Sequence, residues 1–149
     1  MTVREKGGEE MEQAGPIVNA WAVLVAAAWS MVLGFLWYGP VIGKQWAKLA
    51  GIDTSDRSGA LRAMVVQFVT AFLFVWVMAH SIKAFEDAYG YAGAGAGISG
   101  AFWLWLGFVA TTLLIGWNFE RAPFKLYLVN AGFYLVWMLG SGVILGLWP

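Results

Sequence analysis

The side chains that could do chemistry are few, and they lie near the ends of long apolar segments. Around Pro123, the residues Asn118, Glu120 and Arg121 could form a small polar site with Lys125, although a solvated turn before the proline explains them equally well. The single histidine, His80, has no second histidine with which to share a metal ion. The sequence contains no Ser-His-Asp or paired-carboxylate arrangement for nucleophilic or acid–base catalysis. We therefore predict neither an enzyme nor a metal site.

A glycine-rich motif offers a second chemistry. The segment GAGISG at residues 95–100 matches the G-x-G-x-x-G fingerprint of dinucleotide-binding proteins. That fingerprint needs a preceding strand and a later acidic residue that binds the ribose. Here it lies within YGYAGAGAGISG, between two apolar segments. We therefore expect a turn rich in Gly and Ala that runs into a helix, and no nucleotide site.

Composition indicates a membrane protein. Of 149 residues, 60% are hydrophobic and 12% are charged, whereas soluble domains carry about 25% charged residues. The net charge is zero and there is no Cys, so we predict no nucleic-acid partner and no disulfide or thiolate chemistry. Four segments contain no Asp, Glu, Lys or Arg, and they are 31, 20, 32 and 24 residues long. About 20 helical residues cross the hydrocarbon core, so each segment can hold one span.

The charge-free segments predict the fold class and the domain organisation. The chain is expected to be an all-α integral membrane protein, because these segments are apolar all round and lack the alternation of barrel strands. A polar tail over residues 1–15 precedes one four-helix transmembrane domain over residues 16–149. After the first span, the segment KQWAKLA predicts a short amphipathic segment along the inner face. The four spans are placed at about residues 17–38, 61–80, 98–117 and 126–148.

The distribution of Lys and Arg predicts the orientation. The first and third connections carry six of these residues, whereas the tail and the second connection carry three. Because cytoplasmic loops are enriched in Lys and Arg, we expect the first and third connections in the cytoplasm and both termini outside. The six are Lys44, Lys48, Arg57, Arg62, Arg121 and Lys125, and the three are Arg4, Lys6 and Lys83.

Tryptophan and small residues carry the packing signals. The deeper indoles could line a pocket for an aromatic ligand or pigment, but packing is favoured, with each N–H bonded to a neighbouring helix. Small residues recur every four positions in the first and fourth spans, which predicts close helix contacts within one chain or between chains. The deeper indoles are Trp29, Trp76, Trp105 and Trp137. The small residues are Ala22, Ala26, Ser30 and Gly34, then Gly142 and Gly146.

Two segments resemble a known family. NAWAVLVAAAWSMVLGFLWYGPVIGKQW and LWLGFVATTLLIGWNFERAPFKLYLVNAGFYLV are similar to the bacterial domain-of-unknown-function family numbered 1761. The resemblance extends from Asn19 to Leu147 and implies a small four-span inner-membrane protein without an assigned activity. The segment GPVIGKQWAKL is more loosely similar to tryptophan-rich sensory (translocator) proteins, which bind tetrapyrroles or sterols but have five spans.

The resemblance and the polar residues at the span ends together define the candidate functional positions. No acid or base occupies the middle of a span, which disfavours an ion-coupled transporter. The deepest polar side chains can instead bridge helices or contact a ligand. The candidate positions are Asn19, Trp37, Tyr38, Pro40, Lys44, Trp46, Thr111, Thr112, Asn118, Glu120, Lys125 and Asn130.

Three classes of function fit these observations. The favoured class is a structural or accessory protein that acts as a homo-oligomer or as a subunit of a larger membrane complex. Its partners would be the lipid bilayer and other transmembrane helices. The alternative is a binding or transport module for an apolar or aromatic small molecule, such as a lipid, a pigment or a tetrapyrrole. A membrane enzyme that uses Asn118, Glu120 and Lys125 is the least favoured. No cofactor is predicted, although a bound lipid or pigment fits the aromatic content.

Overall fold

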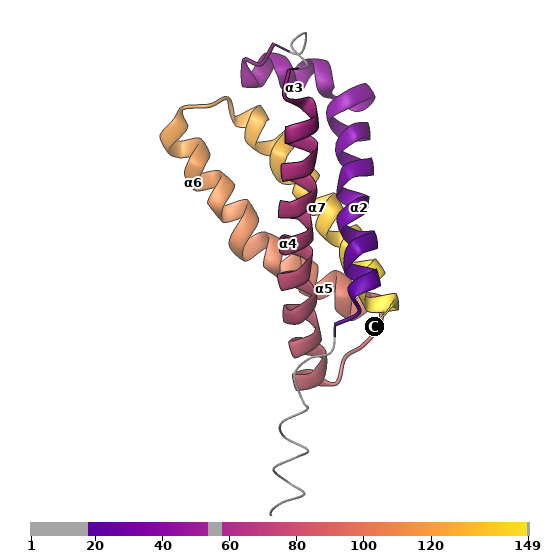
Figure 1. The fold of residues 1–149 in the computed structure, drawn as a ribbon. Coiled ribbons are helices and arrows are strands. Elements are labelled where there is room, and N and C mark those ends of the chain that lie inside the picture. Colours follow the sequence, from indigo (N-terminus) through magenta and orange to yellow (C-terminus); the bar gives the residue numbers. More distant parts are fainter. Residues whose placement is uncertain (1–17, 54–57, 149) are drawn as a thin grey trace, which may run out of the picture.

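The computed structural model describes residues 18–53 and 58–148, and all regular structure in these ranges is helical (Figure 1). The predicted tail over residues 1–15 lies outside them. Four helical segments are long and apolar enough to cross a membrane, which confirms the predicted fold class. These segments cover Ala20–Val41, Ala60–Tyr89, Ala94–Glu120 and Phe124–Leu147. The elements are α2 (Ala20–Leu36), η1 (Trp37–Val41), α3 (Gly43–Ala50), α4 (Ala60–Tyr89), α5 (Ala94–Leu104), η2 (Trp105–Ala110), α6 (Thr111–Glu120) and α7 (Phe124–Leu147).

The first span begins and ends through local chemistry that the sequence supplies. Asn19 precedes α2, and its side-chain oxygen accepts hydrogen bonds from the backbone N–H groups of Trp21 and Ala22 at 3.0 and 3.3 Å. Asn19 is therefore a helix cap. At the other end the chain widens into the π-helical η1, which contains Pro40. The predicted amphipathic segment follows as the eight-residue helix α3.

Two helices extend beyond the predicted spans. Helix α4 has 30 residues and continues nine residues past position 80, until Gly90 ends it at a φ of 70°. At 1.5 Å per residue it is about 45 Å long, which exceeds the roughly 30 Å of the hydrocarbon core. Helix α5 begins at Ala94, four residues before the predicted span. The expected turn over GAGISG is therefore wrong, because these residues form the first turns of α5.

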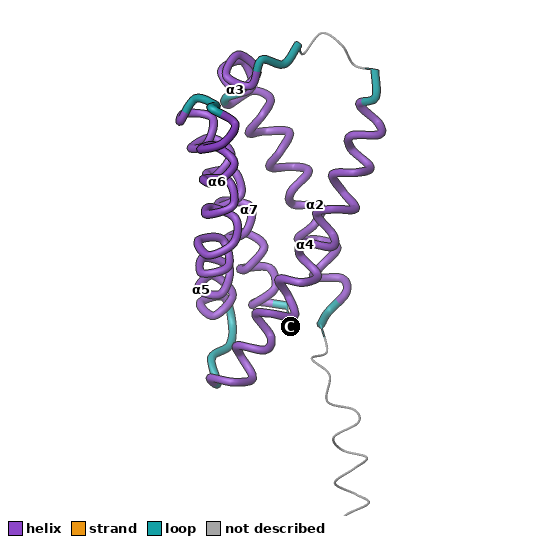
Figure 2. Tube along the Cα trace, turned by 90° about the vertical axis from the view of Figure 1, so that its left-hand side faces the viewer, coloured by secondary structure: helices purple, strands orange, loops and turns teal. Residues whose placement is uncertain are grey.

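The helices make a bundle with two different ends (Figures 1 and 2). We call the end where α2 begins and α7 finishes the termini end, and the opposite end the α3 end. Helix α2 packs against α4 and α7, and α5 packs against α7. From η2 onward, α6 diverges from the rest of the bundle toward the α3 end (Figure 1). Neither α3 nor α6 contains a buried residue, so the core lies toward the termini end.

The small residues of the first span pack within the chain. Ala22 and Ala26 are fully buried, and Ser30 is 1% exposed. The indole N–H of Trp137 on α7 donates to the carbonyl oxygen of Ala26 at 3.4 Å. A Cβ added at Gly34 would lie 3.9 Å from the ring of Phe133 on α7. The sequence left open whether this set of small residues joins helices of one chain or of two, and the structure places it inside one chain.

The small residues of the fourth span join α7 to α5. A Cβ built on Gly142 would overlap the carbonyl oxygen of Gly97 and lie 2.9 Å from the Cβ of Ala101. A Cβ on Gly146 would overlap the carbonyl of Gly93. The two helices thus approach to backbone contact, a distance that only glycine permits. We call this contact, made by Gly93, Gly97, Gly142 and Gly146, the glycine seam.

Candidate functional site

A cleft of about 650 Å³ lies toward the α3 end. Helices α2, α4, α6 and α7 contribute to its lining, together with η1 and α3. Its volume falls in the range of about 300–1,000 Å³ that small-molecule sites occupy. The cleft exists because α6 and the first half of α4 stand apart from α2 and α7 on this side. We call it the α3-end cleft.

A hydrogen bond between two spans lies in the α3-end cleft. The Tyr38 hydroxyl donates to Asn130 Oδ1 at 3.1 Å, which joins η1 to α7. Tyr38 also contacts Trp46 of α3 and Phe133 of α7, each with a ring-centroid distance of 5.0 Å. Three predicted candidates, Tyr38, Trp46 and Asn130, therefore meet at one site although they lie up to 92 residues apart.

The cleft combines aromatic rings with uncharged polar groups. Gln67 of α4 and Ser30 of α2 line it beside Asn130. The Ser30 hydroxyl donates to the carbonyl oxygen of Ala27 at 2.7 Å, so its lone pairs stay available. Among the described residues, the lining contains no Asp, Glu, Lys or Arg. The site can therefore offer amide N–H donors and aromatic faces to a neutral ligand, but no charge.

The polar residues of the third span do not join this site. The hydroxyls of Thr111 and Thr112 donate to the carbonyl oxygens of Gly107 and Phe108 one turn earlier on their own helix. Both threonines are exposed on α6. Neither threonine belongs to the lining of the α3-end cleft, which separates them from this site.

The predicted polar cluster near Pro123 does not assemble in the described residues. Lys44, Asn118, Glu120 and Lys125 are all exposed. Within residues 18–53 and 58–148 the structure contains a single ion pair, which joins Lys83 to Asp87 at the other end of the bundle. The α3-end cleft is lined by aromatic, amide and aliphatic groups rather than by these charges.

The remaining aromatic candidates are packing residues. Trp37 lies against α7, where a Cβ on Gly132 would be 3.5 Å from its ring. The indole N–H of Trp105 donates to the carbonyl oxygen of Ala131 at 3.0 Å, and that of Trp137 donates to the carbonyl oxygen of Ala26 at 3.4 Å. The prediction that deep indoles bond to neighbouring helices is confirmed for these two. Trp29 has no such bond to a described residue and packs instead over Gly140.

Some residues of the site were not distinguishable in the sequence. Phe133, Tyr134 and Met64 line the cleft, but each lies in an apolar segment among residues of the same kind. Gln67 carried a signal, as one of few amides inside a span. A search for amides within apolar segments finds Gln67 and Asn130 together and would have identified the polar part of the site.

One comparison with known proteins gives a match. The family model described as "Protein of unknown function (DUF1761)" matches residues 21–146. No curated protein and no solved structure matches the chain. The family match confirms the resemblance seen in the sequence and covers all four candidate spans almost completely.

Proposed function

The chain belongs to the DUF1761 family of proteins of unknown function, and we propose that it binds a neutral amphipathic or aromatic molecule in the α3-end cleft. It is a multi-pass membrane protein by the length and composition of its helices. The proposal involves no chemical step. Its ligand class is a neutral lipid or pigment that carries a ring and a carbonyl or hydroxyl group.

The observation that carries the proposal is the Tyr38–Asn130 hydrogen bond inside an aromatic cleft. The bond uses Asn130 Oδ1, which leaves the amide N–H groups of Asn130 for a ligand oxygen. The rings of Tyr38, Trp46 and Phe133 give the cleft apolar surfaces that can cover a ligand ring. A few directional polar groups within a mostly apolar lining are typical of small-molecule sites.

The position of the small residues also supports binding over oligomer formation. In the sequence, the stripe from Ala22 to Gly34 and the Gly142–Gly146 pair were the main argument for contacts between chains. In the structure these residues contact α4, α5 and α7 of the same chain. They are therefore not available as the smooth surface on which a second copy would pack.

Purification tests the binding proposal directly. The full chain is extracted in a mild nonionic detergent, and bound molecules are recovered with organic solvent and analysed by mass spectrometry and absorbance. We expect a neutral molecule at near-stoichiometric amount in the wild type and a large loss in Asn130→Leu. Thr112→Val, which changes a polar residue outside the cleft, is the matched control and should retain the molecule. Equal retention by all three proteins, or no neutral molecule in the wild type, would contradict the proposal.

An accessory role is the second candidate, and exposed apolar surface favours it. Every residue from 60 to 70 on α4 is exposed, and Leu61 and Phe119 are 76% and 79% exposed. These surfaces can contact lipid or the helices of another membrane protein. A defined second protein that stays with the chain through detergent purification, together with an empty cleft, would favour this role. A detergent-solubilised monomer with a bound small molecule would favour the first proposal.

We further propose that the chain resides in a bacterial inner membrane with both termini outside. The excess of Lys and Arg in the first and third connections supports this orientation, although Arg4, Lys6 and Arg57 lie outside the described residues. An even number of spans agrees with the position of the start of α2 and the finish of α7 at the same end of the bundle (Figure 1). Reporter fusions at Asp53 and Ala122 should read cytoplasmic, and one after Pro149 should read external. A cytoplasmic C-terminal fusion would reverse the proposed orientation.

A further inference from the structure

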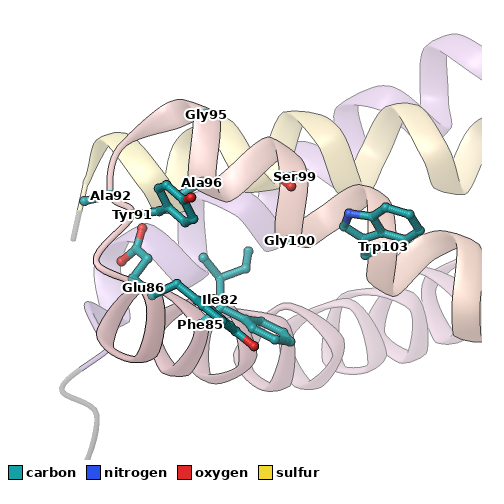
Figure 3. Close-up of a pocket in the computed structure, with 11 residues that line it drawn as sticks. Ile82, Phe85, Glu86, Tyr91, Ala92, Gly95, Ala96, Ser99, Gly100 and Trp103 are labelled. Atoms are coloured by element: carbon teal, nitrogen blue, oxygen red, sulfur yellow. The ribbon is translucent and has the colours of Figure 1, made fainter.

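A second cleft, of about 670 Å³, lies at the termini end and takes no part in the function proposed above (Figure 3). It lies between the end of α4 and the start of α5. Its lining contains four aromatic residues and, among the described residues, one charged side chain, that of Glu86. The α3-end cleft has no charged lining residue, so the two clefts suit different ligands. The four aromatic residues are Phe85, Tyr89, Tyr91 and Trp103.

Helices α4 and α5 are in contact at one level of the cleft. A Cβ on Gly100 would lie 3.0 Å from Ile82 Cγ1, so the two helices are in contact there. The chain then turns between Gly90 and Gly93, whose φ angles are 70° and 84°. Tyr91 lies on this turn, at the polar end of the cleft. Trp103 lies nine residues into α5, about 14 Å deeper at 1.5 Å per residue.

Glu86 is placed to receive a cation. The nearest basic group, Lys83, forms an ion pair with Asp87 one turn along the same helix. Glu86 forms no ion pair with any described residue, and it is half-buried in the cleft lining. Figure 3 shows its carboxylate beside Tyr91 at the turn, with Trp103 at the opposite end of the cleft. A carboxylate next to aromatic faces attracts an ammonium group through both charge and cation–π contact.

The aromatic residues point to a ligand that also has an apolar part. Phe85, Tyr89, Tyr91 and Trp103 are 51–72% exposed, so the protein itself leaves them uncovered. The Phe85 and Tyr89 rings stack with centroids 6.2 Å apart, which makes a continuous apolar wall along α4. A charged group at the helix ends and an apolar surface running toward the bundle centre match the two parts of a membrane lipid.

We infer that the termini-end cleft binds a membrane lipid with an ammonium headgroup, of the ethanolamine phospholipid class. The ammonium would contact Glu86 and the neighbouring rings at the turn, and an acyl chain would run toward Trp103. A free amine would leave the apolar wall uncovered. An anionic headgroup would meet the Glu86 carboxylate at the turn, whereas Lys83, the basic group near it, already forms an ion pair with Asp87.

Lipid competition measures this preference. The full chain, freed of lipid in a nonionic detergent, is mixed with equal amounts of phosphatidylethanolamine and phosphatidylglycerol that carry identical acyl chains, and bound lipid is counted by native mass spectrometry. We expect wild type to favour the ethanolamine lipid by roughly threefold to tenfold. Glu86→Gln should bring the ratio close to one, and Glu86→Asp should leave it in between. Glu120→Gln makes the same charge change at the other end of the bundle and should keep the wild-type ratio.

Two further measurements test lipid binding in the termini-end cleft without a change at Glu86. Tyr91→Leu removes an aromatic face without changing charge, so it should lower the ratio even if Glu86→Gln proves too unstable to purify. Ethanolamine alone should not displace the bound lipid, because it lacks the acyl chain. A wild-type ratio of one, a ratio unchanged in both variants, or displacement by free ethanolamine would each overturn the proposal.

Discussion

The four spans are similarly apolar, but the two halves of the bundle that they form are packed in different ways. At the termini end, the glycine seam brings the backbones of α5 and α7 into contact, and Ala22 and Ala26 are fully buried. At the α3 end, α6 contains no buried residue, and residues 60–70 of α4 are all exposed. The third span shows both behaviours, because its first part forms the seam and its last part diverges (Figure 1).

We infer that residue size, more than hydrophobicity, determines where these helices make close backbone contacts. Within a bilayer, lipid tails are as apolar as leucine, so burying apolar side chains between helices brings little gain. Small residues allow backbones to approach and to make many dispersion contacts. On α6, the large side chains of Leu114, Ile115 and Phe119 remain exposed. Helix α6 contains no buried residue, and it lines one side of the α3-end cleft through Leu113.

The largest expected effect comes from filling the glycine seam. Gly142→Ala places a Cβ in overlap with the carbonyl of Gly97 and 2.9 Å from the Cβ of Ala101. Because the nearest neighbour is a backbone carbonyl, it cannot give way without moving α5 from α7. We expect a loss of about 1–3 kcal/mol in the free energy of unfolding, and more for Gly142→Leu. Denaturant titration in a fixed detergent measures it.

Gly107, which lies on the same span as α5 but outside the glycine seam, provides the control. A Cβ on Gly107 meets no atom within 4 Å, so Gly107→Ala should change the free energy of unfolding by less than about 1 kcal/mol. If Gly107→Ala and Gly142→Ala destabilise the protein equally, the glycine seam is no more sensitive to an added Cβ than the rest of the bundle.

A smaller effect is expected at Gly140, where the Trp29 indole occupies the space that a side chain would fill. A Cβ on Gly140 would lie 2.5 Å from Trp29 Nε1, so Gly140→Ala must displace the ring. We expect a loss of about 1–2 kcal/mol, since a side chain moves more easily than a backbone. Trp29→Phe should relieve most of it, because the smaller ring leaves room and removes a buried N–H that has no partner among the described residues. A double-mutant cycle between the two positions measures this coupling, and strictly additive losses would contradict the contact.

At the α3 end, substitution of Gly34 allows the effects on stability and on ligand binding to be measured separately. Gly34 lines the α3-end cleft, and a Cβ there would make an ordinary 3.9 Å contact with Phe133. Gly34→Ala should therefore be mild. Gly34→Leu has the space of the cleft to enter, so we expect a loss of only about 1 kcal/mol, together with loss of any bound neutral molecule. Thermal melts and the extraction assay report the two quantities, and a loss of stability as large as that of Gly142→Leu would show that the cleft is closed.

Much of this architecture could be predicted from the sequence, because charge-free length is a property of each segment alone. The four spans, the short helix after the first, and the small residues at Ala26 and Gly142 all follow from local composition or spacing. The site was predicted in part. Tyr38, Trp46 and Asn130 were among the candidates and do meet, whereas Lys44 and Asn118 do not join them.

What could not be predicted depends on contacts between distant segments. The local sequence predicts a turn at Gly97, because glycine lowers the stability of a helix by roughly 0.5–1 kcal/mol. It is helical because Gly142, 45 positions later, packs against it. The divergence of α6 (Figure 1) also depends on its packing against other segments, which its own sequence does not reveal. The termini-end cleft likewise arises from the contact of Ile82 with Gly100.

The smallest effect is expected at Glu120, the only acid near a span end on the α3 side that the structure describes in a helix. From the sequence, we expect Glu120 to pair with a Lys or Arg across the first and third connections. In the structure Glu120 is exposed and forms no ion pair with a described residue. An exposed carboxylate without a partner contributes little to the free energy of unfolding, because solvent screens its interactions with other charges. Glu120→Gln should therefore melt within about 0.5 kcal/mol of the wild type, and it should keep both the neutral molecule and the ethanolamine lipid. A clear loss of stability in Glu120→Gln that Lys44→Met or Arg62→Met reproduces would show that charge pairs stabilise the α3 end. The two ends of the bundle would then differ in the chemistry of their contacts as well as in residue size.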